Sequence, residues 1–457
     1  MTSDATVAPR VRPILNQVLA NAGVLLGGRT ANALISLAYM AVAARALGVD
    51  QVGVLILINA FAQLVGEVVK FNSWQTVLRF GAAPLADGRR EQLQQVIRFT
   101  MFLDFASGLV GVTVAAAVAY FAGQRLGWGA EHAPAAALYC LTAAMLTPAT
   151  ATGILRLFNR FDVLAAQAPI GSAVRLVGGG AALVLGVSLN AFLLIWALGT
   201  IAAFVYVTAA SVGELRRRGL MSGFKVRGPL TAGLPGAWRF AWATNFSSGV
   251  DTAFTHVITL VVGGVVGPGP AALWRIGRQV ADAMAKPAKL LVPALYPELA
   301  RLHVTHGEHA MRRLALQVGL LGGGVGTLLL LVAAIAGRPL LGFILGESFE
   351  AGAGVMTWQV AAAVIGIWAL PLEPMLVSLG RPGDVLKVRL VVCVALLAVL
   401  VPVTRAFGLA GAGAALVCAM VGLAVGMFLM LQRNAGAAPA PYEIACAEDP
   451  AQAKRNP

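Results

Sequence analysis

The chain has 457 residues, of which 58% are hydrophobic and 12% are charged, and its mean hydropathy is +0.80. A soluble protein of this length carries far more charge, so the composition excludes a soluble globular protein. The net charge of +14 does not indicate a nucleic-acid partner, because the basic residues are spread between apolar segments. Apolar runs of about 20 residues recur along the whole chain and predict an all-α, polytopic membrane protein.

Twelve apolar runs are long enough to cross the membrane as helices. Their limits are roughly residues 17–44, 51–73, 95–122, 134–158, 165–187, 189–212, 236–264, 270–300, 310–336, 352–379, 384–405 and 409–432. Basic residues concentrate on the side that holds the N-terminus, and the opposite side has little more than Arg45, Arg125, Arg338 and Arg405. The positive-inside rule therefore predicts that both termini are cytoplasmic. Trp128 falls at the expected outer interface, where indole rings commonly anchor a helix.

Matching residues in the two halves indicate an internal repeat. They are separated by 219, 222 and 223 residues in the pairs Gly48 and Gly267, Asp162 and Asp384, and Pro148 and Pro371. Six helices are an even number, so both halves insert with the same orientation, related by an axis along the membrane normal. We expect residues 1–212 and 236–433 to form two six-helix bundles, residues 213–235 a cytoplasmic linker, and residues 434–457 a disordered cytoplasmic tail.

The eighth predicted helix carries a stripe of charges at helical spacing. Its members, three or four residues apart and within about 80° of one another around the helix, are Arg275, Arg278, Asp282, Lys286 and Lys289. Each charge costs about 2.5–3.5 kcal/mol near the centre of a bilayer, so this face cannot point to lipid. Lys286 and Lys289 have the alternative of extending their ammonium groups to the cytoplasmic surface.

The second predicted helix repeats this spacing. Its residues Asn59, Gln63, Glu67 and Lys70 map with a shift of 219 onto the last four residues of the stripe in the eighth helix. The matching faces predict a hydrated central cavity between the two halves. A purely structural alternative is that Glu67 with Lys70, and Asp282 with Lys286, are local ion pairs inside a packed bundle.

Further charged residues within the spans are candidates for substrate or ion binding. Arg29 and Arg175 either face the cavity or extend to the surface. Asp251, near the middle of the seventh helix, is the best candidate for an H⁺ or Na⁺ carrier, with a salt bridge as the alternative, and Asp282 and Glu67 are further candidates for ion coupling. Asp104 and Glu373 lie nearer the cytoplasmic ends and are weaker candidates. Pro148 and Pro371 interrupt their helices as hinges or fixed kinks.

The sequence favours neither an enzyme nor a resident cofactor. It has no phosphate-binding loop and no nucleophile triad or paired carboxylates on a sizeable outer loop. His303, His306 and His309, beside Glu308, have helical spacing, but an exposed cytoplasmic segment is a poor metal site, and we expect no metal. Coupling to H⁺ or Na⁺ stays open.

Several segments resemble polysaccharide flippases of the multidrug/oligosaccharidyl-lipid/polysaccharide exporter (MOP) superfamily. These are Ala44-Arg45-Ala46-Leu47-Gly48 followed by Gly53, then Gly153-Ile-Leu-Arg-Leu-Phe-Asn-Arg-Phe161, Asp251, and Leu345-Gly346-Glu347-Ser348-Phe349. The resemblance implies a MATE-like, V-shaped fold that exports an undecaprenyl-diphosphate-linked oligosaccharide by alternating access. It further implies the bacterial inner membrane, polysaccharide or lipopolysaccharide biosynthesis, and contacts with membrane lipids and polysaccharide assembly proteins.

Arginine suits a diphosphate, because its planar fork donates two parallel hydrogen bonds. The nearest alternative is a MATE-type drug/cation antiporter, whose cavity should be acidic. A membrane polysaccharide polymerase or ligase is a more distant alternative, because the predicted outer loops are short.

Overall fold

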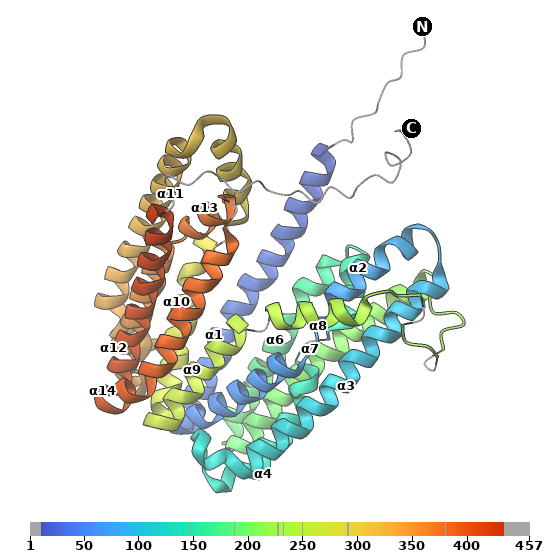
Figure 1. The fold of residues 1–457 in the computed structure, drawn as a ribbon. Helices are drawn as coiled ribbons and strands as arrows, with labels where there is room; N and C mark the ends of the chain where they lie inside the picture. Colours follow the sequence, from blue (N-terminus) through green and yellow to red (C-terminus); the bar gives the residue numbers. More distant parts are fainter. Residues whose placement is uncertain are drawn as a thin grey trace. The chain divides into compact units, whose positions relative to one another are not determined.

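The computed structural model describes residues 11–433 except positions 147, 187, 226–227, 232, 249, 290–291 and 380, and this part of the chain is helical throughout, without a strand. Figure 1 shows the α-helices in chain order. They are α1 (Val11–Val69), α2 (Ser73–Ala86), α3 (Arg90–Ala122), α4 (Ala133–Cys140), α5 (Ala149–Leu157), α6 (Phe161–Leu185), α7 (Leu189–Arg217), α8 (Ala237–Ser248), α9 (Val250–Val266), α10 (Pro268–Lys289), α11 (Val292–Leu345), α12 (Ala353–Trp368), α13 (Leu372–Ser378) and α14 (Pro382–Arg433).

The described helices account for the predicted membrane spans. Eight helical stretches are long and apolar enough to cross a membrane, and Thr255–Val266 is a shorter apolar helix. Two of the eight hold two spans each, because α1 is interrupted at Gly48 and α14 at Gly408, where the backbone leaves helical geometry. The chain is thus an all-α, multi-pass membrane protein.

The two halves turn at equivalent glycines. Three pairs of glycines with positive φ, 219, 219 and 222 residues apart, lie between corresponding helices: Gly48 (φ 73°) and Gly267 (101°), Gly127 (98°) and Gly346 (108°), and Gly186 (64°) and Gly408 (59°). A positive φ is strained for any residue with a side chain, so glycine is required at such turns. The same three turns in the same order support the internal repeat.

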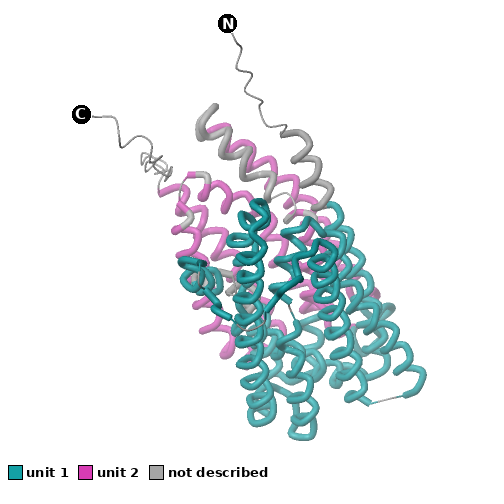
Figure 2. Tube along the Cα trace, turned by 90° about the vertical axis from the view of Figure 1, so that its right-hand side faces the viewer, with its two compact units in different colours: residues 1–275, 341–349 teal, residues 276–340, 350–457 magenta. Residues whose placement is uncertain are grey.

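Two compact units are distinguished in Figure 2. Unit 1 comprises residues 1–275 and 341–349, and unit 2 comprises residues 276–340 and 350–457. The bundle limits expected from the sequence, 1–212 and 236–433, stay a prediction.

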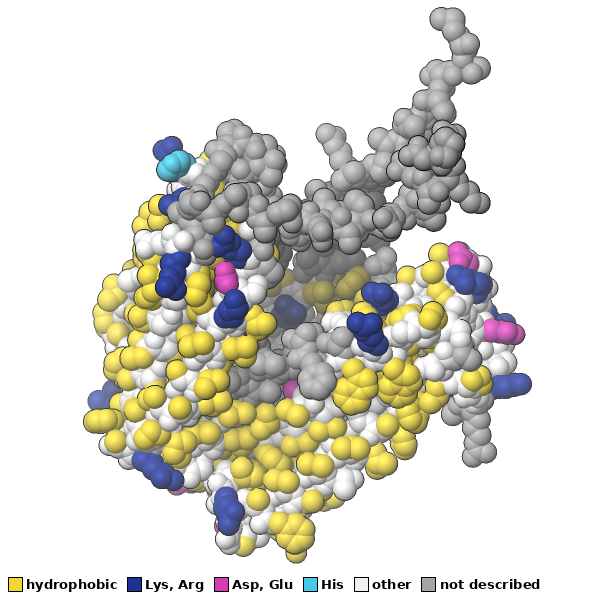
Figure 3. All heavy atoms as spheres, viewed as in Figure 1, with side chains coloured by type: hydrophobic (Ala, Val, Ile, Leu, Met, Phe, Trp, Pro, Cys, Tyr) yellow, Lys and Arg dark blue, Asp and Glu magenta, His cyan; other side chains and the backbone are white. Residues whose placement is uncertain are grey.

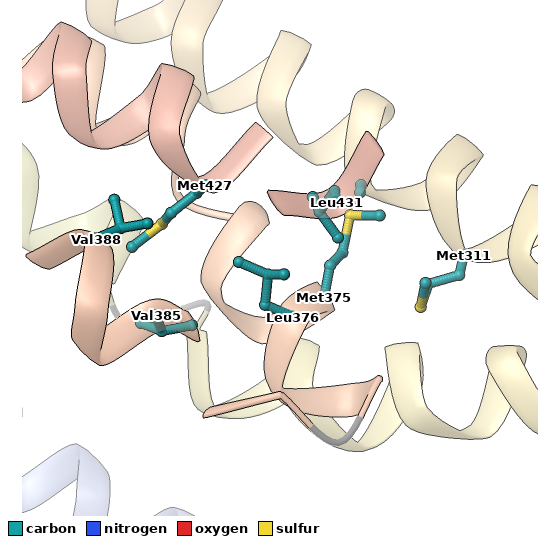
Figure 4. Close-up of a cluster of buried hydrophobic side chains, with 8 residues drawn as sticks. Met311, Met375, Leu376, Val385, Val388, Met427 and Leu431 are labelled. Carbon is teal, nitrogen blue, oxygen red and sulfur yellow. The ribbon is translucent and has the colours of Figure 1, made fainter. Parts of the chain in front are cut away.

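Hydrophobic side chains cover most of the helix surface in view in Figure 3. Phe121 is 84% exposed, Val184 85% and Phe343 82%, which is the pattern of lipid-facing helices. Each unit also has an apolar interior. In unit 2, Met311, Met375 and Met427 pack with leucine and valine side chains from α13 and α14 (Figure 4).

Trp128 corrects one expectation. It is only 1% exposed, and its indole N–H donates a hydrogen bond to the carbonyl of Ala119 at 3.3 Å. The ring packs inside unit 1 against Phe61 rather than anchoring a helix at the membrane surface.

Candidate functional site

Polar side chains from α1 and α4 meet inside unit 1. The buried Asn59 of α1 accepts a hydrogen bond from the Tyr139 hydroxyl of α4, with 2.8 Å between the oxygens. Gln63, one turn further along α1, donates to the same Asn59 oxygen at 3.5 Å. Asn59 and Gln63, both predicted site residues, therefore belong to one buried hydrogen-bond network.

Arg175 of α6 lies beside this network. Its guanidinium is centred 5.0 Å from the Trp196 ring and 5.8 Å from the Tyr39 ring, and these two rings meet edge to face. One Nη atom donates to the Thr200 hydroxyl of α7 at 3.0 Å. Gly199 leaves the space for this side chain, since a Cβ there would lie 2.9 Å from Arg175 Cγ. The aromatic rings attract the cation and hold its plane.

The charge of Arg175 is not neutralised by a neighbouring acid. Arg175 forms no ion pair with any residue that the structure describes, and its Nε is buried without a hydrogen-bond partner. Tyr139 lies within electrostatic range of the guanidinium, which joins Arg175 to the network around Asn59. We call Arg175, Thr200, Tyr39, Trp196, Tyr139, Asn59 and Gln63 the Arg175 cluster.

A second hydrogen-bond chain joins α6 to α1. The hydroxyl of Ser172 donates to Asn32 at 2.7 Å and lies 3.3 Å from the hydroxyl of Ser36. Because Ser172 and Arg175 are three residues apart on α6, both point toward α1 from one side of the helix. Polar groups therefore line the packing of α6 on α1, which are neighbouring helices.

The charged stripe of α10 is partly described. Arg278 and Asp282 form an ion pair at 3.3 Å, so the local partner of Asp282 is Arg278 and not the Lys286 of the structural alternative. Lys286 is exposed, and Arg275 is half-buried and has a polar partner. The side chains of Lys289 and of Asp251 on α9 lie outside the described residues, as do those of His303, His306 and Glu308. The central cavity stays a prediction.

Two other candidates have local surroundings. Glu67 and Lys70 form an ion pair at 3.9 Å, as the structural alternative expected. Arg29 is exposed on α1, within electrostatic range of Arg156, whose guanidinium stacks 4.0 Å from the Trp74 ring centre.

Sequence reasoning missed the aromatic half of the cluster. Tyr39, Tyr139 and Trp196 lie in apolar runs, and nothing in their spacing distinguishes them from ordinary core residues. The one available signal is Arg175 itself, because a cation inside a membrane helix needs neighbours that stabilise it.

Comparison with solved structures defines the class of fold. The chain matches an inward-facing multidrug resistance MATE family transporter of the MOP superfamily with a TM-score of 0.68 at 11% identity, covering 88% of this chain and 94% of that chain. It matches the lipid II flippase MurJ, in an inward closed conformation, with a TM-score of 0.65 at 11% identity, covering 89% and 87%. The chain has the fold of MOP-superfamily transporters.

Sequence comparison gives the family. No family model matches the chain. Inner membrane protein YghQ of Escherichia coli (strain K12) is 30% identical over 333 residues, which are 73% of this chain and 93% of that protein. The chain belongs to the family of YghQ.

Proposed function

We propose that this protein is a transporter that flips an undecaprenyl-diphosphate-linked oligosaccharide across the bacterial inner membrane by alternating access, and that it is not an enzyme. The fold supports transport, because solved MATE transporters and a lipid flippase share it. The name of the relative YghQ supports the inner membrane. Both termini are placed in the cytoplasm by the distribution of basic residues.

The Arg175 cluster is the observation that carries the choice of substrate. A diphosphate entering a desolvated bundle needs a cation, and Arg175 is a cation without an acidic partner among the described residues. Tyr39 and Trp196 fix the plane of the guanidinium, so its remaining N–H groups are oriented before the substrate arrives. A hydrogen bond to a charged group contributes about 1.5–3 kcal/mol.

The stripe of α10 supplies a second cationic element in this proposal. Arg275, Arg278, Lys286 and Lys289 would contact the diphosphate or acidic sugars, and Arg29 would contact the substrate near the cytoplasmic side. Asp251, with Asp282 and Glu67, would couple transport to H⁺ or Na⁺. Polysaccharide assembly proteins would deliver the lipid-linked substrate and remove it.

A MATE-type drug/cation antiporter is the second candidate, favoured by the match to a MATE family transporter. An organic cation needs a carboxylate or an unoccupied aromatic face. In the Arg175 cluster the aromatic rings already hold a guanidinium, which would repel a second cation.

Transport into proteoliposomes distinguishes the two candidates. We expect the purified protein to expose a fluorescent undecaprenyl-diphosphate oligosaccharide to a membrane-impermeant glycosidase and to leave ethidium untransported. Arg175→Ala should lower the flipping rate about 10- to 100-fold, the equivalent of about 1.5–3 kcal/mol. The matched control is Arg338→Ala, which removes an exposed arginine paired with Glu350 at 2.9 Å. Ethidium transport without lipid transport would reverse the assignment.

A further inference from the structure

A small pocket opens in unit 1 where the fourth predicted span is interrupted. Helix α4 ends at Cys140, a short 3₁₀ turn follows at Leu141–Met145, and α5 begins at Ala149 after Pro148. The pocket has a volume of about 20 Å³ and is lined by Lys70, Asp104, Ser107 and the backbone of the 3₁₀ turn. A pocket of this size holds one water molecule.

Asp104 of α3 points one carboxylate oxygen at the broken helix. Its Oδ2 accepts a hydrogen bond from the Thr150 N–H at 2.8 Å. Thr150 lies in the first turn of α5, and Pro148 at the N-cap makes no side-chain hydrogen bond, so Asp104 satisfies a backbone N–H that has no partner in its own helix. The positive end of the α5 dipole favours a carboxylate here.

The other oxygen of Asp104 has no partner. Oδ1 is buried without a hydrogen bond, and the nearby hydroxyls of Ser73 and Thr150 also lack partners. Ser73 is 1% exposed and Thr150 6% exposed, so bulk water does not solvate them. Burying an unpaired carboxylate oxygen and two hydroxyls costs free energy unless the pocket holds a ligand.

The surroundings favour a proton over a metal cation. Lys70, beside the end of α1, faces the pocket, and its ammonium lies 3.9 Å from Glu67 Oε1. It is the charged group that acts on Asp104 among the described residues, since α2 contributes Ser73, α5 contributes Thr150 and the 3₁₀ turn contributes alanines. An adjacent ammonium repels Na⁺, and a one-water pocket cannot supply the several oxygen ligands that a metal ion needs.

We propose that Asp104 is a proton-binding site of unit 1. A proton from the pocket water adds to Oδ1, and the neutral carboxyl then donates a hydrogen bond to that water while Oδ2 keeps its bond from Thr150. Release returns the proton to the water. In the protonated state Lys70 retains Glu67 alone as a counter-charge, so proton exchange changes the charge balance where α1 ends.

The second half of the repeat has no counterpart. The position 219 residues after Asp104 is Gly323, and a Cβ there would collide with the Trp368 ring. The indole occupies the volume that the carboxylate and pocket occupy in the first half. Proton binding at Asp104 stands independently of the transported molecule, and only its coupling to transport rests on the proposed function.

Infrared difference spectroscopy of the full-length protein in lipid bilayers tests the site without any substrate. As the pH is lowered, we expect the C=O stretching band of a protonated carboxyl to appear in the wild type and to be absent in Asp104→Asn, whose amide oxygen can still accept from Thr150. Glu373→Gln is the matched control, because Glu373 is also a half-buried acid and pairs with Arg389 at 3.1 Å; the Asp104 band should remain.

A second variant tests the charge environment. Lys70→Met removes the neighbouring ammonium, so the band should appear at a higher pH than in the wild type. Three results would each overturn the proposal: no such band in the wild type, a band that persists in Asp104→Asn, or a midpoint that moves with Na⁺ concentration. Because no lipid-linked sugar is present, failure here leaves the flippase proposal standing.

Discussion

The turn glycines give a prediction with a magnitude set by backbone geometry alone. A Cβ added at Gly48 or at Gly186 would meet no atom within 4 Å, so steric clash contributes nothing. Gly48 has φ 73° and ψ 176°, a region open essentially to glycine only, where a side chain costs about 1–3 kcal/mol. Gly186 has φ 64° and ψ 35°, the ordinary left-handed region, where the cost for alanine is about 1–2 kcal/mol.

The two positions should respond differently to asparagine. Asparagine adopts the left-handed region more readily than alanine, so Gly186→Asn should recover part of the loss seen in Gly186→Ala. Gly48→Asn should remain as destabilised as Gly48→Ala. The matched control is Gly180→Ala, which also enters open space but lies within α6, and there alanine should stabilise by about 0.5–1 kcal/mol.

The free energy of unfolding, measured by SDS titration in mixed micelles with tryptophan fluorescence, checks these values. The Gly48→Ala protein should fall about 2 kcal/mol or more below the Gly180→Ala protein, which combines the two backbone effects. Equal stability of these two variants would refute the reasoning, and so would recovery by Gly48→Asn.

Three other outcomes are expected. Arg278→Ala should abolish flipping while the protein still inserts in the membrane, because a cationic contact to the diphosphate is lost; a normal rate would remove α10 from the substrate path. Tyr139→Phe should lower the free energy of unfolding by about 1 kcal/mol, the contribution of its hydrogen bond to Asn59, and an unchanged value would show that the bond contributes nothing. Single cysteines at positions 59, 63, 278 and 282, in a background without native cysteines, should react with a membrane-impermeant thiol reagent during transport; if none reacts in any state, the predicted cavity is refuted.

The sequence predicts the membrane fold well, because apolar runs and helix length are set by the thickness of the bilayer. It also identifies the Gly48 and Gly267 turns and the repeat offset. The four remaining turn glycines carry the same offset in the sequence, but only their positive φ distinguishes them from the many glycines that pack helices. Local backbone geometry is thus visible in the sequence only where a second landmark accompanies it.

The candidate site is less predictable, because helical spacing says which residues share a face but not which helix that face meets. Asn59 and Gln63 appear in the sequence as part of a charged stripe, yet their partner in the structure is Tyr139 from a different apolar run. Asp104 ranks low by its depth in α3. Its importance arises from Pro148, which ends one helix and leaves the Thr150 N–H free to meet a distant carboxylate.

The paired turn glycines have a consequence for tracing distant relatives. Lipid-facing positions tolerate exchange among leucine, valine, isoleucine and phenylalanine, so side-chain identity decays quickly, as the 11% identity to the matched transporter illustrates. A backbone angle that only glycine adopts without strain allows no such drift. These six glycines therefore act as a ruler within the chain, against which sequences too diverged for ordinary alignment can be placed in register.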